Sequence, residues 1–225
     1  MSAGDLCAVL FDLDGTLLDT APDFATVLNR LLDEEGRAPM AWERIRAAVS
    51  NGSRALIERA FGIELTHPEF ARLRERLLQL YAANLCVDTT PFPGISELLA
   101  ELGARDLRWG VVTNKPLWLA EPLLQRAALL PPLQVLVCPE HVQRTKPDPE
   151  PLLLACARIG CEPAQAIYIG DHRRDIEAGR SAGMRTIAAG WGYLEPGEMV
   201  QDWQADHTVD SVADVQRLIM NFLDG

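Results

Sequence analysis

The sequence predicts an α/β fold, with a doubly wound and mostly parallel sheet that carries an inserted α-helical cap. The first observation behind this prediction is a series of short, almost continuous apolar runs at residues 7–11, 109–113, 134–138, 166–170 and 186–189. Such runs are typical of strands that are buried on both faces of a parallel sheet. The second observation is that helical patterns separate these runs, because strands alternating with helices indicate a doubly wound domain.

The third observation is that the chain between the first two of these strands contains no strand-like run. Residues 20–88 instead contain four stripes of apolar side chains at helical spacing, which begin near Phe24, Ile45, Leu56 and Phe70. This pattern predicts a small bundle of helices, and the proline-rich segment 89–94 marks the return to the sheet. We therefore expect an α/β core formed by residues 1–19 and 89–225, with a helical cap formed by residues 20–88.

The remaining helices are predicted from periodicity and from residues that begin or end helices. Apolar residues at helical spacing predict helices over residues 95–102 and after Pro116, which suits a first turn. A further helix begins at Asp148 and Pro149 and is expected to end before Gly160. Two more helices are predicted over residues 175–182 and 212–222.

Composition and charge disfavour several classes of protein. The 225-residue chain has 21 Lys and Arg against 32 Asp and Glu, and its net charge of −11 disfavours nucleic acids as partners. Its five cysteines form no CxxC pair, so we expect free thiols in a reducing cytoplasm and not a zinc cluster or disulfide framework. The N-terminal segment lacks the pattern of a signal peptide, and no stretch approaches about 20 apolar residues, so no membrane span is expected.

The strongest motif lies at the end of the first predicted strand. Asp12 and Asp14 stand two residues apart in Asp-Leu-Asp-Gly-Thr, and Gly15 allows the chain to turn sharply there. Ligands of open α/β sheets bind at the carboxyl ends of strands. Two aspartates at this spacing are often only an acidic turn. The longer D-x-D-G-T match is much rarer by chance, so it indicates a functional site.

Three further groups of polar residues follow other predicted strands. They are Thr113 with Asn114, then Lys146, and then Asp171 with Asp175. Each has an ordinary explanation by itself, as a helix cap, a solvated lysine or an acidic helix N-terminus. Because they follow successive strands of one sheet, we expect them to converge on the crevice that also contains the D-x-D motif.

As an ordered set, these motifs resemble the haloacid dehalogenase superfamily, specifically its phosphatase branch. The resemblance covers nearly the whole chain, from DLDGT through the helical segment to VVTNK, KPDPEP and GDHRRD. It implies that Asp12 is the nucleophile that forms an aspartyl-phosphate, and that Asp14 is first the general acid and then the general base. It also implies that Thr113 and Lys146, with Asn114 beside them, hold the transferring phosphoryl group.

The resemblance further implies a magnesium site. Its ligands would be Asp171, the Asp12 carboxylate and the Asp14 backbone carbonyl, with Asp175 as a supporting residue. The chemistry agrees, because bare carboxylates repel a phosphate dianion and Mg²⁺ prefers oxygen ligands. Superfamily members that cleave carbon–halogen or carbon–phosphorus bonds lack the second aspartate of the motif, so Asp14 favours phosphate-ester hydrolysis.

The cap is expected to select the substrate. Ser53 and Arg54, in the loop Asn-Gly-Ser-Arg, stand where related capped enzymes contact the distal group of the substrate. Arg54 could pair with a carboxylate or a second phosphate, although an exposed arginine at a helix start explains it equally well. His172 departs from the family pattern, and we expect it to be a solvent-exposed loop residue in preference to a hydrogen-bonding residue behind the site.

The chain resembles phosphoglycolate phosphatases in its length, in the type of its cap and in the amino-acid sequence of its motifs. The stretches VVTNKP, CPEHV, KPDPEPLLLAC and GYLEP, with Trp203 and Asp206, resemble a subgroup that dephosphorylates N-acetylmuramic acid 6-phosphate in cell-wall recycling. We expect a small carboxylated phosphomonoester as the substrate, with the amino-sugar acid slightly ahead, and no obligate protein partner. The alternatives are a phosphosugar mutase of the same superfamily and, less favoured, a catalytically silent binding module.

Overall fold

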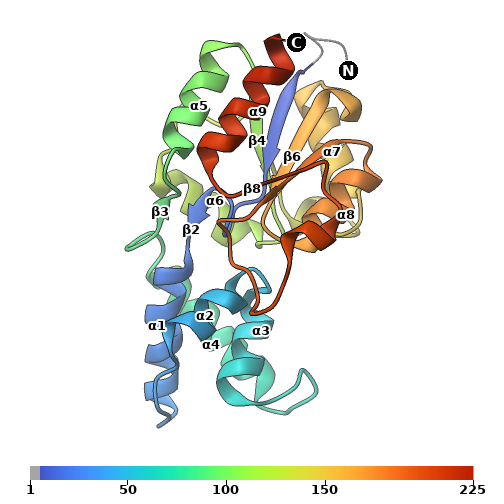
Figure 1. Cartoon of the computed structure of the whole chain (residues 1–225). Coiled ribbons are helices and arrows are strands. Elements are labelled where there is room, and N and C mark those ends of the chain that lie inside the picture. Colours follow the sequence, from blue (N-terminus) through green and yellow to red (C-terminus); the bar gives the residue numbers. More distant parts are fainter. Residues whose placement is uncertain (1–5, 225) are drawn as a thin grey trace.

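Six parallel strands form the main sheet, in the order β5–β4–β1–β6–β7–β8 (Figure 1). The structure is a computed structural model that describes residues 6–224. Residues 1–5 belong to the N-terminal segment that was expected to lack a signal-peptide pattern, and they lie outside the described residues. The strands are β1 (Ala8–Phe11), β4 (Arg108–Val112), β5 (Val135–Val137), β6 (Ala166–Gly170), β7 (Arg185–Ala189) and β8 (His207–Val209). The predicted doubly wound sheet is therefore confirmed, and β8 is an edge strand that the apolar pattern did not predict.

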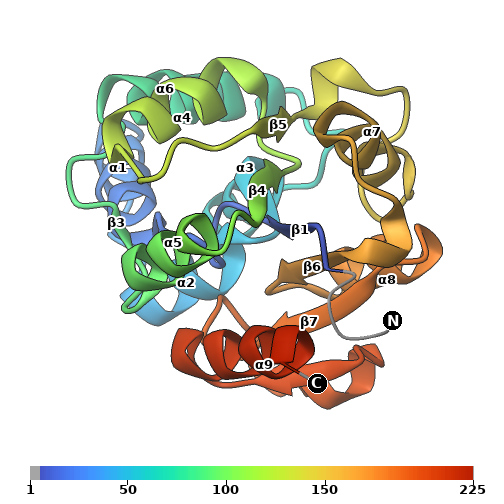
Figure 2. The ribbon, with the colours of Figure 1, turned by 90° about the horizontal axis from the view of Figure 1, so that it is seen from above.

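Helices cover both faces of this sheet, as Figure 2 shows from above. On one face α5 (Ile95–Ala104) packs against β4 and α9 (Val212–Asp224) packs against β8 and α5. On the other face α7 (Glu150–Ile159) packs against β4 and β5, and α8 (Arg173–Ser181) packs against β6 and β7. The side chains of β1 and β6 are almost fully buried, because both faces of these central strands are covered.

Four helices lie beyond the end of the sheet toward which β1 runs (Figure 1). They are α1 (Ala21–Glu34), α2 (Trp42–Val49), α3 (Gly52–Phe61) and α4 (Phe70–Ala83), and we refer to them together as the cap. The apolar stripes of the sequence pack against one another here. The rings of Phe24 on α1 and Tyr81 on α4 stack with their centroids 3.9 Å apart.

A two-stranded antiparallel ribbon joins the cap to the sheet. Its strands are β2 (Leu18–Asp19) and β3 (Thr90–Pro91), which are the exit from and the return to the core. The remaining helix, α6 (Leu117–Ala127), begins after Pro116 at the end of β4 and lies beside the cap. None of the helices among the described residues is long and apolar enough to cross a membrane.

Candidate active site

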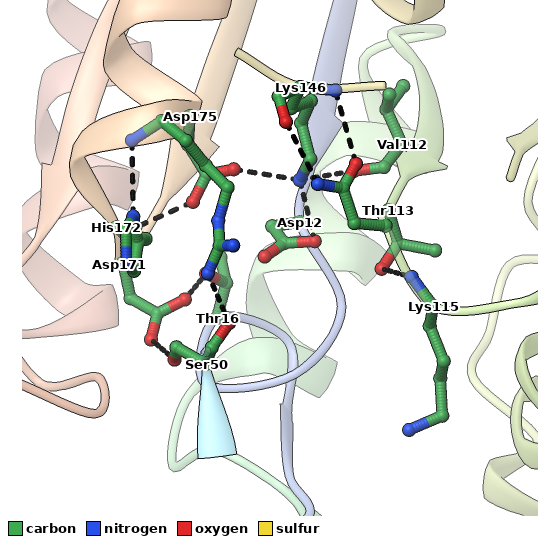
Figure 3. Close-up of polar contacts among 12 residues, drawn as sticks. Asp12, Thr16, Ser50, Val112, Thr113, Lys115, Lys146, Asp171, His172 and Asp175 are labelled. Atoms are coloured by element: carbon green, nitrogen blue, oxygen red, sulfur yellow. Dashed lines mark hydrogen bonds and ion pairs between the residues drawn. The ribbon is translucent and has the colours of Figure 1, made fainter. Parts of the chain in front are cut away.

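The carboxyl ends of three neighbouring strands define the site. Asp12 follows β1, Thr113 follows β4 and Asp171 follows β6, and β1 pairs with both of the other strands. Lys146 reaches the same place from the connection between β5 and α7 (Figure 3). The structure thus brings the separate sequence motifs together in the crevice where open α/β sheets bind their ligands.

Lys146 lies at the centre of this group and is almost completely buried. Its Nζ lies 2.9 Å from Asp12 Oδ1 and 2.7 Å from Asp175 Oδ1, and it donates to the carbonyl oxygen of Val112 at 3.0 Å. Burial by itself would lower the pKa of Lys146, but the two carboxylates outweigh it, so its pKa lies above the ordinary value. Lys146 is therefore a fixed positive charge beside Asp12.

Three carboxylates crowd around one point of the site. One oxygen each of Asp12, Asp171 and Asp175 lie within 4.8 Å of one another. Burial, followed by repulsion from the other two carboxylates, raises the pKa of Asp171 to about 7. Burial also raises the pKa of Asp175 to about 6, although the charge of Lys146 opposes the shift. This crowding of negative charge is unfavourable unless a cation or protons relieve it.

Asp171 is held by a shell of hydrogen bonds from three parts of the chain. Thr16 Oγ1 donates to Asp171 Oδ1 at 2.9 Å, and Ser50 Oγ and the backbone N–H of Tyr193 donate to Oδ2 at 2.7 and 3.0 Å. Gly15 makes this approach possible, since it has a φ of +84° and a Cβ there would overlap the carboxylate of Asp171. Thr16, Ser50 and Tyr193 were not predicted from the sequence as members of the site.

The residues present suit a magnesium ion. Mg²⁺ takes oxygen ligands, and the three clustered carboxylates supply negative oxygen donors that are already crowded together. Asp175 is occupied on both oxygens, by Lys146 and by the backbone N–H of His172 at 3.1 Å, which fits a supporting position. Asp12 and Asp171 are then the carboxylates best placed to ligate a cation.

Asp14 has a different environment from Asp12, although the two residues belong to one turn. Lys115 Nζ lies 2.8 Å from Asp14 Oδ1, and the hydroxyl of Thr20 donates to the same oxygen at 2.6 Å. Lys115 is buried, and it is held in turn by the hydroxyl of Tyr81 at 3.1 Å. Lys115 was not predicted as a site residue, although it directly follows Thr113 and Asn114 in the VVTNK motif.

Thr113 and Asn114 occupy distinct positions beside Lys146. Thr113 Oγ1 accepts a hydrogen bond from the backbone N–H of Lys115 at 3.1 Å, which leaves its own O–H able to donate into the site. Asn114 Nδ2 donates to the backbone carbonyl oxygen of Lys146 at 3.0 Å, and Asn114 Oδ1 accepts from the backbone N–H of Lys146 at 3.2 Å. Its side chain therefore fixes the Lys146 segment.

A cavity of about 230 Å³ lies between the cap and the carboxyl ends of the strands. Asp12, Asp14 and Lys146 line it from the core, and Ser53 and Arg54 line it from the N-terminal turn of α3. The predicted cap residues thus face the same cavity as the carboxylates. Arg54 forms an i,i+4 ion pair at 2.8 Å with Glu58, and its side chain is 62% exposed.

His172 corrects one expectation from the sequence. It is half-buried and not a solvent-exposed loop residue. Its Nδ1 accepts from the backbone N–H of Arg174 at 3.2 Å, as the N-cap of α8, and its Nε2 lies 3.0 Å from Asn51 Oδ1 of the cap. Burial lowers its pKa to about 4, and the charge of Arg174 adds to this effect. His172 is therefore a neutral hydrogen-bonding link between core and cap.

Comparison with known proteins identifies similar chains. Residues 9–189 match the family model described as haloacid dehalogenase-like hydrolase. N-acetylmuramic acid 6-phosphate phosphatase of Pseudomonas aeruginosa is 49% identical over 205 residues, which are 91% of each chain. Phosphoglycolate phosphatase of Xylella fastidiosa is 40% identical over 202 residues, which are 90% of this chain and 88% of that protein.

A solved structure shows the same architecture. The crystal structure of a protein described as a predicted phosphoglycolate phosphatase from Haemophilus somnus superposes with a TM-score of 0.82. The two chains are 28% identical, and the match covers 96% of this chain and 98% of the other. The arrangement of sheet and cap is therefore shared along nearly the whole length of both chains.

Proposed function

Because the chain belongs to the haloacid dehalogenase-like hydrolases, we propose that it hydrolyses a small carboxylated phosphomonoester and releases inorganic phosphate. N-acetylmuramic acid 6-phosphate is the first candidate and 2-phosphoglycolate is the second, since relatives of 49% and 40% identity carry the names of phosphatases for these compounds. The observation that carries the proposal is the pair Asp12 and Asp14. These two carboxylates share one turn and one cavity but have different cationic partners.

We assign the nucleophile to Asp12. Its Oδ1 is held by Lys146 Nζ at 2.9 Å, which leaves Oδ2 to attack phosphorus. As the new Oδ2–P bond forms, the bond between phosphorus and the ester oxygen breaks, and its electron pair goes to the leaving alkoxide. Splitting hydrolysis in this way gives an aspartyl-phosphate as the intermediate between two easier steps.

Asp14 is assigned the proton transfers. Lys115 and Thr20 both bind its Oδ1, which fixes the orientation of the carboxyl group and leaves Oδ2 for the proton transfers. In the first step Asp14 gives a proton to the leaving alkoxide, and in the second it takes a proton from the attacking water. That water forms a bond to phosphorus as the Asp12–phosphorus bond breaks, which restores the Asp12 carboxylate and yields inorganic phosphate.

The phosphoryl group is held by positive charge and hydrogen-bond donors already in place. Lys146 supplies the charge, Thr113 supplies a hydroxyl donor, and Asn114 fixes the backbone that carries Lys146. Asp12 and Asp171, together with the Asp14 carbonyl, would hold Mg²⁺, which when bound neutralises the crowded carboxylates and the phosphoryl oxygens. Such preorganised charge is the main requirement of phosphoryl transfer.

The cap completes the site by covering it. Tyr81 contacts Lys115, and Ser50 contacts Asp171, so residues of the cap support residues of the core directly. A covered cavity restricts bulk water and strengthens the electrostatic interactions within it. The five cysteines are free thiols, which is in keeping with the proposed location of the enzyme in a reducing cytoplasm.

The test is phosphate release from a panel of substrates, with and without Mg²⁺. The panel contains p-nitrophenyl phosphate, 2-phosphoglycolate and N-acetylmuramic acid 6-phosphate, and no bisphosphate activator is added. We expect Mg²⁺-dependent release of free phosphate that the Asp12→Asn variant abolishes. Wild-type turnover in Asp12→Asn would refute the assignment of Asp12 as the nucleophile. Isomerised sugar phosphate, formed without free phosphate and only when a sugar bisphosphate is supplied in a separate assay, would indicate a mutase instead.

A further inference from the structure

The cationic side chains that line the cavity differ in what they bind. Among the residues that the structure describes, five such side chains face it: Arg54, Arg74, Lys115, Lys146 and Arg174. Lys115 and Lys146 pair with aspartates of the site, and Arg54 pairs with Glu58. Arg174 donates to the backbone carbonyl of Ser50. Most of the positive charge around the cavity is therefore already engaged by the protein.

Arg174 and Arg74 both form no ion pair with a carboxylate of the described residues; of the two, Arg74, on α4, also lines a second groove that adjoins the cavity. Its Nε donates to Ser53 Oγ at 2.9 Å, and in the described part of the chain its guanidinium meets no carboxylate. The bond to Ser53 orients the planar group while leaving the other nitrogens available. A guanidinium binds a carboxylate through two parallel N–H donors, so Arg74 offers what an anionic group of a ligand needs.

Arg74 also belongs to a second depression that adjoins the cavity. Arg74 and Leu78 line both, and Trp118 lines the adjoining groove from α6 of the core. The groove therefore adjoins the cavity and lies between α4 and α6, since residues of both helices line it. Trp118 is 51% exposed, and its indole is a flat apolar surface beside polar groups of Glu75 and Gln79.

These features match the parts of one kind of molecule. A pyranose ring presents an apolar face of C–H groups that packs on an aromatic ring, and its hydroxyl and amide groups need hydrogen-bond partners. A carboxylate on such a ring needs a cation. Trp118 and Leu78 supply the apolar surface, Glu75 and Gln79 the polar groups, and Arg74 the cation. A two-carbon phosphate such as 2-phosphoglycolate would use none of the groove except Arg74.

We propose that Arg74 and Trp118 form a distal subsite that selects a carboxylated sugar phosphate, with Arg74 binding the carboxylate and Trp118 the sugar ring. This inference rests on the proposed function, because it assumes that the phosphoryl group lies between Asp12 and Lys146. It assigns the carboxylate to Arg74 and not to Arg54, which Glu58 holds. Arg74 and Trp118 are specificity-determining residues, and neither takes part in the bond changes at phosphorus.

The experiment compares kcat/KM for two sugar phosphates that differ by one group. N-acetylglucosamine 6-phosphate lacks the lactyl carboxylate of N-acetylmuramic acid 6-phosphate and otherwise has the same ring. Arg74→Ala should lower kcat/KM for the carboxylated sugar on the order of 10-fold more than for the uncarboxylated one. Arg74→Lys should recover part of this loss, because lysine keeps the positive charge but lacks the two parallel N–H donors of the guanidinium.

Trp118→Ala should lower kcat/KM for both sugars by a similar factor, on the order of 5-fold, and should leave their ratio unchanged. Trp42→Ala is the matched control, since Trp42 is an exposed indole on α2 that is not among the residues lining the cavity or the groove. It should change neither value. Arg54→Ala is measured alongside, and circular dichroism with thermal unfolding shows that each variant is folded.

Equal losses for the two sugars in Arg74→Ala would overturn the assignment of the carboxylate to Arg74. A selective loss in Arg54→Ala, without one in Arg74→Ala, would overturn it in favour of Arg54. Wild-type activity for both sugars in Trp118→Ala would remove Trp118 from the subsite. The proposed function fails separately, if the wild-type protein releases no phosphate from p-nitrophenyl phosphate or from either sugar.

Discussion

Replacing Asp171 with asparagine removes one of three crowded carboxylates and tests whether the site is built for a cation. Asp171 is fully buried, and burial together with Asp12 and Asp175 raises its pKa from 3.8 to about 7. The folded protein therefore binds this proton more tightly than the unfolded chain does. Stability falls as the pH rises from about 4 to about 7, and the charged carboxylate costs roughly 4 kcal/mol at pH 8.

The Asp171→Asn variant lacks this cost but loses part of the hydrogen bonding. Thr16 can still donate to an amide oxygen, whereas the backbone N–H of Tyr193 would face an amide nitrogen, at a cost of about 1–3 kcal/mol. That loss is the same at every pH. The pH-dependent part of the stability difference comes from the charge of Asp171 alone, and roughly 3 kcal/mol of it lies between pH 5 and pH 8.

The assay is urea unfolding of both proteins at pH 5 and pH 8 in the presence of EDTA, repeated at pH 8 with Mg²⁺. Relative to the wild type, the variant should gain roughly 3 kcal/mol of stability between pH 5 and pH 8. Mg²⁺ should stabilise the wild-type protein and leave the variant unchanged, because its ligand is gone. A stability difference that does not depend on pH would contradict the raised pKa of Asp171, and equal stabilisation of both proteins by Mg²⁺ would contradict its role as a cation ligand.

Three other substitutions test individual contacts. Lys115→Gln should lower kcat for sugar phosphates on the order of 10-fold and lower it less for p-nitrophenyl phosphate, whose leaving group needs no proton; equal losses would argue against a role in proton transfer. Gly15→Ala should destabilise the protein by roughly 1–3 kcal/mol in thermal unfolding and weaken Mg²⁺ binding, because its Cβ would overlap Asp171; an unaltered melting curve would contradict this. Asn114→Ala should release the backbone of Lys146, so inorganic phosphate should inhibit the variant about 10-fold more weakly, and an unchanged inhibition constant would count against the assignment.

The central strands were predictable because they are buried on both faces. The run from Ala166 to Gly170 needs apolar side chains in both directions, so it stands out in the sequence without any knowledge of its neighbours. The edge strand His207–Val209 has one neighbour and is partly exposed, and its three residues carry no such run. Helix α8 begins at Arg173, two residues before the predicted start, because His172 caps it and histidine is not a usual cap.

The candidate site was predictable where a residue type follows a strand, and not where a contact crosses the fold. Asp12 and Lys146 could be picked out from motifs, since each motif marks the end of a strand or the connection that follows one. Lys115 belongs to the site because its ammonium group contacts Asp14, which lies 101 residues away in the sequence. His172 forms a hydrogen bond with Asn51, which lies 121 residues away. Nothing local distinguishes a lysine or a histidine that will be buried by a distant segment. Such contacts appear only when the cap and the core are placed together.

The Asp14→Asn variant makes the proposed covalent intermediate on Asp12 observable. With p-nitrophenyl phosphate the leaving group departs without a proton, so the first step proceeds. The second step requires a base to activate water, and Asn cannot act as one. We therefore expect a burst of about one equivalent of p-nitrophenolate, followed by slow turnover.

The most direct measurement is to quench this reaction during the burst, reduce it with borohydride and map the protein by mass spectrometry. Reduction converts an aspartyl-phosphate to homoserine, which marks the phosphorylated position. We predict homoserine at position 12 in an amount that matches the burst, and none when substrate is omitted. A burst without modification at Asp12, or with modification at another residue, would contradict the assignment of Asp12 as the nucleophile.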